Sequence, residues 1–94
     1  MEITGKNRII KFMASHADRR KALTAWIADA ERENWQTPQD IKNLYRSVDF
    51  LADNRAIFNI RGNNYRLVVQ IRYINGIIRI EWIGTHAEYS KKEF

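Results

Sequence analysis

Residues 54–80 read NRAIFNIRGNNYRLVVQIRYINGIIRI, a stretch that holds five arginines but no Asp or Glu. Apolar residues alternate with other residues along it, which is the period-two pattern of β-strands. Leu67 and Val69 have one parity, whereas Arg66 and Gln70 have the other. The pattern therefore predicts an antiparallel sheet with one apolar face and one face that carries arginine.

Two turn signals divide this stretch into three strands. Gly62-Asn63-Asn64 and Asn75-Gly76 both contain residues that tolerate positive φ, as hairpin turns require. We predict that the third strand ends at Gly84. Simple alternation in this strand predicts one side with Ile78, Ile80 and Trp82, and another with Arg79, Glu81 and Ile83.

The first half of the chain has helical spacing instead. Leu23, Trp26, Ile27 and Ala30 recur at i, i+3, i+4 and i+7, which predicts an amphipathic helix that Asp18 would cap. The remaining predictions are an edge strand at 1–4, a helix at 6–16 ending in His16, a helix starting at Thr37-Pro38, a connection at 47–53 and a polar tail at 86–92. Helices followed by a meander predict an α+β fold with N-terminal helices packed on a twisted antiparallel sheet.

Length and composition narrow the class of protein. A chain of 94 residues is expected to form a single domain, residues 1–94. The absence of cysteine excludes disulfides and thiolate metal sites. The first residues do not form a signal peptide, and no apolar run is long enough to span a membrane, so we expect a cytoplasmic protein.

The arginines have two interpretations. The formal net charge is +5, and ten of the sixteen basic residues are Arg, which binds phosphate through a planar fork. An acid-free basic surface is typical of proteins with anionic partners. Long cationic side chains also occur on exposed strands simply to block edge pairing.

His86 and Tyr89 follow the last predicted strand. His86 has the only side chain in the second half of the sequence that ordinarily titrates near neutral pH. A ribonuclease without a metal needs a base, an acid and cations around phosphorus, and His, Tyr, Lys and Arg supply these functions. The simpler interpretation, which the residues alone favour, is that His86 is an ordinary polar residue after a strand end. The acids are scattered singly, so we expect no metal and no cofactor.

The second half of the sequence contains two motifs. The first is Phe58-Asn59-Ile60 with Gly62-Asn63 and Tyr65-Arg66-Leu67, and the second runs from Trp82 to Tyr89. Together these motifs resemble the HigB-type toxins of bacterial type II toxin–antitoxin systems, which belong with the RelE-like toxins. The resemblance implies the small RelE-like α+β fold and an endoribonuclease that cleaves mRNA on translating ribosomes and so inhibits translation and growth. It also implies an antitoxin partner with a helix-turn-helix domain.

The resemblance also implies roles for single residues. Asn59, Arg61, Asn64 and Arg66 would lie near the concave sheet face, beside His86 and Tyr89. The expected catalytic roles are general acid or base for His86, phosphate binding for Arg61 and Arg66, and base stacking or proton donation for Tyr89. The remaining expected RNA-binding residues are Arg55, Asn59, Asn64, Arg72, Arg79, Lys91 and Lys92. Ser90 stands where this pattern commonly has Asp, so no role is assigned to that position.

Three hypotheses about function follow. The first is a metal-independent mRNA endoribonuclease that leaves 2′,3′-cyclic or 3′-phosphate ends. The second is a toxin of the same fold with a target other than RNA, like the ParE-like toxins that act on gyrase. The third is a basic RNA-binding module without catalytic activity, whose binding would weaken steeply with salt.

Overall fold

The computed structural model describes residues 1–15, 17–62 and 64–92. His16 and Asn63, at the end of a predicted helix and in a predicted turn, lie outside the described residues. In chain order the elements are β1 (Glu2–Thr4), α1 (Lys6–Ser15), the 3-10 turn η1 (Ala17–Arg19), α2 (Arg20–Arg32), α3 (Pro38–Leu44), β2 (Asp49–Leu51), β3 (Arg55–Ile60), β4 (Tyr65–Arg72), β5 (Ile77–Thr85) and α4 (His86–Ser90).

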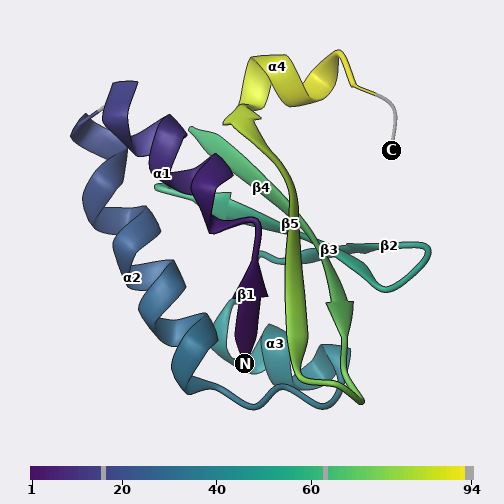
Figure 1. The fold of residues 1–94 in the computed structure, drawn as a ribbon. Helices are drawn as coiled ribbons and strands as arrows, with labels where there is room; N and C mark the ends of the chain where they lie inside the picture. Colours follow the sequence, from purple (N-terminus) through teal and green to yellow (C-terminus); the bar gives the residue numbers. More distant parts are fainter. Residues whose placement is uncertain (16, 63, 93–94) are drawn as a thin grey trace.

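The strands form one five-stranded sheet in the order β1-β5-β4-β3-β2. Strands β2 to β5 pair antiparallel, and β1 adds a parallel edge to β5. Helices α1 and α2 lie along one side of the sheet, whereas α4 extends from the end of β5 (Figure 1). The prediction of an α+β fold is confirmed, and the parallel pairing of β1 makes the sheet mixed.

The core lies between the sheet and the helices, where the strand alternation predicts it. Phe58, Leu67 and Val69 are at most 1% exposed and belong to one buried apolar cluster with residues of α2 and α3. The ring of Trp26 meets Phe58 edge-on with 5.2 Å between centroids, and Trp35 stacks on Phe58 at 6.1 Å. Aromatic rings therefore anchor the α2 region to the centre of the sheet.

Helix α3 begins as its sequence predicts. Thr37 is the N-cap and accepts a hydrogen bond from the backbone N–H of Asp40 at 3.3 Å. The Asp40 carboxylate accepts from the Thr37 N–H at 3.2 Å, which completes a capping box, and Pro38 is the first helical residue. Local capping chemistry alone is enough to place this helix start.

A buried arginine fastens η1 to the sheet. Arg19 is 5% exposed, and its guanidinium lies 4.0 Å from the ring centroid of Phe12 and 4.1 Å from that of Tyr65. Its Nε lies 3.9 Å from a carboxylate oxygen of Asp18. The prediction that Asp18 caps α2 is wrong, because the N-cap is Arg19 and makes no side-chain cap bond. The Asp18 carboxylate is occupied by tertiary partners instead.

The sequence pattern mispredicts which way β5 faces. Val68 pairs with Trp82 but Val69 pairs with Ile80, so Glu81 is an extra residue in β5. Such a bulge reverses the alternation. Trp82 and the residue after it therefore lie on the opposite sides from those predicted. The indole of Trp82 lies on the face opposite to the one that Ile80 buries in the core.

Two segments predicted to be irregular have regular structure. The predicted connection at 47–53 contains β2, which pairs with β3 at the sheet edge, and Phe50 in it is 40% exposed rather than tucked inward. The predicted polar tail begins with the short helix α4, whose N-cap is Thr85. The strand β5 also continues one residue beyond Gly84. Both segments are too short for their periodicity to be read from sequence.

Candidate functional site

The sheet face opposite α1 and α2 carries a small apolar floor surrounded by polar and charged residues. Ile57 and Val68 pair across β3 and β4 on this open face and are 2% and 0% exposed, yet they lie outside the main core cluster. The next cross-strand row joins Asn59, Arg66 and Gly84. The centre of the open face is therefore packed and shielded from solvent, and strand pairing fixes the positions of the polar residues around it.

Four residues at the α4 end of this face form an arginine–aromatic cluster, made of Arg66, Trp82, Tyr89 and Lys92. The Arg66 guanidinium carbon lies 4.8 Å from the ring centroid of Tyr89. The rings of Tyr89 and Trp82 are 6.1 Å apart, and the Lys92 ammonium lies 5.9 Å from the Trp82 ring. Strands β4 and β5 and helix α4 thus bring cations and aromatic faces together, which is a combination suited to phosphates and bases.

Arg66 is not neutralised by an acid. Within the described parts of the chain it makes no ion pair, and its Nε is buried without a hydrogen-bond partner. Its register partner Asn59 donates from Nδ2 to the carbonyl of Ser47 at 3.0 Å, while the Asn59 Oδ1 is buried and unpartnered. An unpartnered buried polar group is costly, of the order of 1–3 kcal/mol. Such groups are typical of sites completed by a ligand or water.

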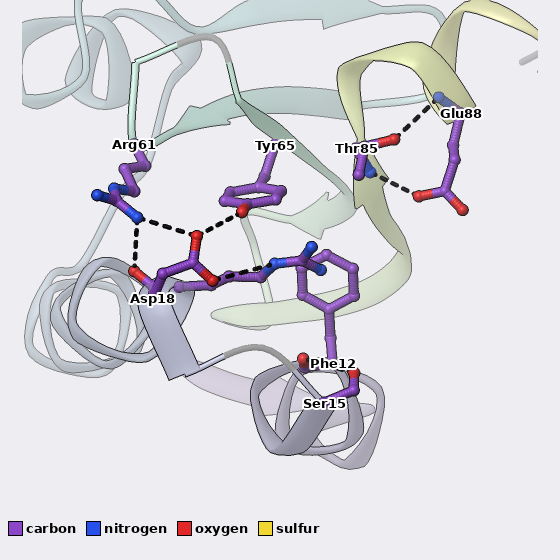
Figure 2. Close-up of polar contacts among 8 residues, drawn as sticks. Phe12, Ser15, Asp18, Arg61, Tyr65, Thr85 and Glu88 are labelled. Carbon is purple, nitrogen blue, oxygen red and sulfur yellow. Dashed lines mark hydrogen bonds and ion pairs between the residues drawn. The ribbon is translucent and has the colours of Figure 1, made fainter.

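Helix α4 presents His86 at the same end of the sheet. His86 is its first residue, is exposed, and donates its backbone N–H to the carbonyl of Asn64 at 3.1 Å. Figure 2 shows the capping box at the start of α4, in which Thr85 accepts from the N–H of Glu88 at 3.1 Å and the Glu88 carboxylate accepts from the N–H of Thr85 at 2.8 Å. Because Thr85 and Gly84 pair with Tyr65 and Arg66, α4 begins directly beside the first residues of β4.

Arg61 does not lie where the resemblance places it. Its φ of 54° ends the alternation of β3, and its Nη1 contacts the carboxylate of Asp18 at 3.0 Å and the Asp18 carbonyl at 3.1 Å. The same carboxylate accepts from the Tyr65 hydroxyl at 2.8 Å (Figure 2). Tyr65 belongs to the core face, so Arg61 points toward the helices and not toward Arg66. The two arginines therefore do not converge in this structure, and phosphate binding by Arg61 stays a prediction.

The pKa of Asp18 is consistent with its ion pair to Arg61. The hydrogen bond from Tyr65 lowers the pKa of the Asp18 carboxyl below its ordinary value of 3.8, and the charges of Arg61 and Arg19 lower that pKa further. Asp18 is thus ionised at neutral pH and compensates the charge of Arg61. An arginine already paired in this way is a weaker anion site than an unpaired one.

The other predicted cations are spread along the sheet. Arg55 donates to the carbonyl of Ala52 at 3.1 Å, and Arg79 forms an ion pair with Glu81 at 2.9 Å. Arg72 is exposed beside a polar pocket of about 290 Å³ at the opposite end of β4. At about 3.3 Å per residue it lies about 20 Å from Arg66 along the strand. Asn64, Lys91 and Lys92 are exposed near α4, on the side of the cluster.

Trp82 is the residue of the cluster that sequence reasoning misses. We expected it in or near the core, but it is only partly buried and lies over Gly84. A methyl group at Gly84 would lie 2.6 Å from the indole ring, so the ring occupies the space that a side chain would take. A Trp two residues before a Gly at a strand end is the local signal that could have indicated this arrangement.

Two further properties concern metals and membranes. Among residues 1–15, 17–62 and 64–92, no group of three or more His, Cys, Asp or Glu is arranged to hold a metal ion. In the same part of the chain, no helix has the length and apolar character needed to cross a membrane.

Residues 19–92 match the family described as HigB_toxin, the RelE-like toxic component of a toxin-antitoxin system. A curated relative, the mRNA interferase HigB of Escherichia coli O6:H1, is 26% identical over 72 residues, which cover 74% of this chain and 70% of that protein. The family match includes all residues from α2 to α4 and hence the whole arginine–aromatic cluster. This chain therefore belongs to the HigB family of RelE-like toxins, the toxic components of toxin-antitoxin systems.

Proposed function

We propose that this toxin is an endoribonuclease that cleaves mRNA and thereby inhibits translation and growth. The observation that carries the proposal is Arg66, which has no acid partner among residues 1–15, 17–62 and 64–92 and lies over Tyr89 at the strand end where His86 begins α4. The similarity to a protein named mRNA interferase supports the choice of mRNA as substrate. Arg66, which forms no ion pair among the described residues, supports an anionic substrate independently of that similarity.

The reaction needs no group beyond those of the site. The ribose 2′ oxygen attacks phosphorus while its proton passes to a base, the bond from phosphorus to the 5′ oxygen breaks, and an acid protonates that oxygen. The products are a 2′,3′-cyclic phosphate, which water can open to a 3′-phosphate, and a 5′-hydroxyl end. His86 is the base or the acid, Tyr89 stacks on a base or donates the proton, and Arg66 stabilises the extra negative charge at phosphorus.

Arginine replaces a metal ion in this scheme. The transition state carries more negative charge on its phosphoryl oxygens than the substrate does, and a guanidinium fork binds two such oxygens at once. Arg66 forms no ion pair among the described residues, whereas Arg61 is engaged by Asp18. We accordingly expect cleavage to persist in EDTA.

The remaining partners follow from the family. We propose that the toxin cuts mRNA on translating ribosomes in the cytoplasm and that an antitoxin with a helix-turn-helix domain neutralises it. The exposed cations near α4, Lys91 and Lys92, are expected to contact the RNA backbone beside the cleavage site.

Induced expression of wild type and His86→Ala tests the proposal. Wild type should arrest growth and produce new RNA 5′ ends, and purified toxin that has been treated with EDTA and then freed of it should still cleave mRNA on translating ribosomes. His86→Ala should fold and lose both effects. Lys21→Gln is the control, since Lys21 is an exposed cation of α2 that lies beside Asp18 and Arg61 and not in α4.

Three outcomes would contradict the proposal. Full toxicity of a folded His86→Ala variant would remove His86 from the mechanism. Growth arrest with intact mRNA and altered DNA supercoiling would favour a ParE-like target. RNA binding without cleavage or growth arrest would favour a non-catalytic RNA-binding module.

A further inference from the structure

A groove of about 350 Å³ lies between helix α1 and strand β5, outside the sheet face described above. Its lining residues are Arg8, Lys11, Phe12, Trp82 and Ile83. They combine two cations with two aromatic rings and one aliphatic side chain. The groove forms where β1 no longer covers β5, because β1 pairs only with residues 77–79 and α1 packs along the rest of the strand.

Trp82 joins this groove to the arginine–aromatic cluster. Trp82 lines the groove, and its ring is also 6.1 Å from the ring of Tyr89 and 5.9 Å from the Lys92 ammonium. One residue therefore belongs to both surfaces. A nucleic-acid strand that is bound at the cluster and extends past Trp82 would next reach α1.

The charge of the groove is positive and uncompensated. Arg8 and Lys11 are exposed, stand one helical turn apart on α1, and make no ion pair within the part of the chain that the structure describes. The acids of β5 and α4 have partners of their own, since Glu81 pairs with Arg79 and Glu88 caps α4. Two free cations beside aromatic rings are what a single-stranded nucleic acid requires of its binding surface.

We propose that this groove binds the single-stranded RNA that flanks the cleavage site, with Arg8 and Lys11 on phosphates and Trp82 stacked on a base. The proposal rests on the proposed function, since it extends the substrate surface of that site around the edge of β5. An acidic protein segment would also meet the charge requirement. Continuity with the cluster through Trp82 favours RNA, because a strand held at Arg66 and Tyr89 is led into the groove.

Binding of uncleavable 2′-O-methyl oligonucleotides of two lengths, about four and about twelve nucleotides, tests the proposal. The variant is Arg8→Gln/Lys11→Gln, and the matched control is Arg20→Gln/Lys21→Gln, which removes two exposed cations from α2 instead. Fluorescence anisotropy at several salt concentrations measures affinity, and thermal unfolding confirms that both variants fold.

The variant should bind the longer oligonucleotide about tenfold more weakly than the control does, and its salt slope should fall by about 0.7 for each phosphate that the variant no longer neutralises. Its affinity for the shorter oligonucleotide should not change. Equal binding by variant and control at both lengths would overturn the assignment. If that variant also escaped neutralisation by the antitoxin, the groove would belong to a protein partner.

The proposed function and the groove assignment can be contradicted independently of each other. Absence of RNA cleavage by wild type would end the proposed function, but it would leave the length-dependent binding difference measurable. Cleavage by wild type together with equal binding by variant and control would retain the function and end the groove assignment.

Discussion

Two arginines of this protein lie over aromatic rings, and they differ in what else surrounds them. Arg19 is 5% exposed, lies between the rings of Phe12 and Tyr65, and has Asp18 3.9 Å from its Nε. Arg66 is partly exposed, lies over Tyr89 alone and has no acid partner within the described residues. The cation–π pair of Arg19 is therefore buried beside an acid, whereas that of Arg66 is partly exposed and has no acid partner among the described residues.

The difference separates a structural role from a recognition role. Two rings and a carboxylate leave Arg19 no access to a solute, so its interactions contribute to holding η1 and α1 on the sheet. Arg66 keeps one side of its guanidinium available, and its charge is uncompensated until an anion binds. The neighbouring acid, more than the arginine or its ring, decides between the two.

The largest expected effect is on catalysis. Arg66→Ala should lower the cleavage rate by about 10²–10³-fold, because it removes the cation proposed to stabilise the transition state. The free energy of unfolding should change by less than about 1 kcal/mol, which is the scale of one exposed cation–π contact. Single-turnover cleavage and urea unfolding measure the two quantities. A variant that cleaves normally would contradict the assignment of Arg66.

Arg19→Ala should have the opposite pattern. Loss of the stacked guanidinium leaves a void between Phe12 and Tyr65, and we expect the free energy of unfolding to fall by about 2 kcal/mol. Cleavage per folded molecule should be retained. Urea unfolding monitored by tryptophan fluorescence measures stability, and an activity assay well below the unfolding midpoint measures function. A variant that is as stable as wild type but inactive would contradict the structural role that we assign to Arg19.

An acid placed beside Arg66 should make it resemble Arg19. Asn59 is its cross-strand partner, and Asn59→Asp puts a carboxylate within reach of the guanidinium. We expect RNA cleavage to fall about tenfold, since a carboxylate competes with phosphate for the same donors. Asn43→Asp, at an exposed position in α3, adds the same charge away from the open face and should cleave like wild type. Equal activity in both variants would indicate that the charge state of Arg66 is unimportant.

The smallest effect concerns the pH dependence of stability around Arg19. The folded-state pKa of Asp18 lies below its ordinary value of 3.8, chiefly because Tyr65 donates a hydrogen bond to it. A depressed carboxyl pKa contributes stability that is present above the unfolded-state value and is lost as pH falls through the folded-state value. Tyr65→Phe should therefore make acid unfolding begin at a higher pH. Circular dichroism during acid titration measures this, and an unchanged midpoint would contradict the prediction.

Much of the fold is predictable because it follows from local chemistry. The capping box at Thr37 and Asp40 needs residues only three positions apart, and the apolar faces of β3, β4 and α2 follow from periods of two and 3.6. The phase of β5 is not predictable in this way. Its bulge at Glu81 is a property of the pairing with β4, and no pattern within β5 marks it.

The candidate site divides in the same manner. The sequence by itself determines that a cationic face exists, because residues 54–80 alternate and contain no acid, and it places His86 after the last strand. Only the tertiary structure decides which arginine stays free. Arg61 and Arg66 look alike in sequence, yet Asp18, 43 residues away, neutralises the first. Charge compensation depends on distance in space and not on spacing along the chain, so the partner that engages one arginine, and leaves the other open to phosphate, becomes visible only after folding.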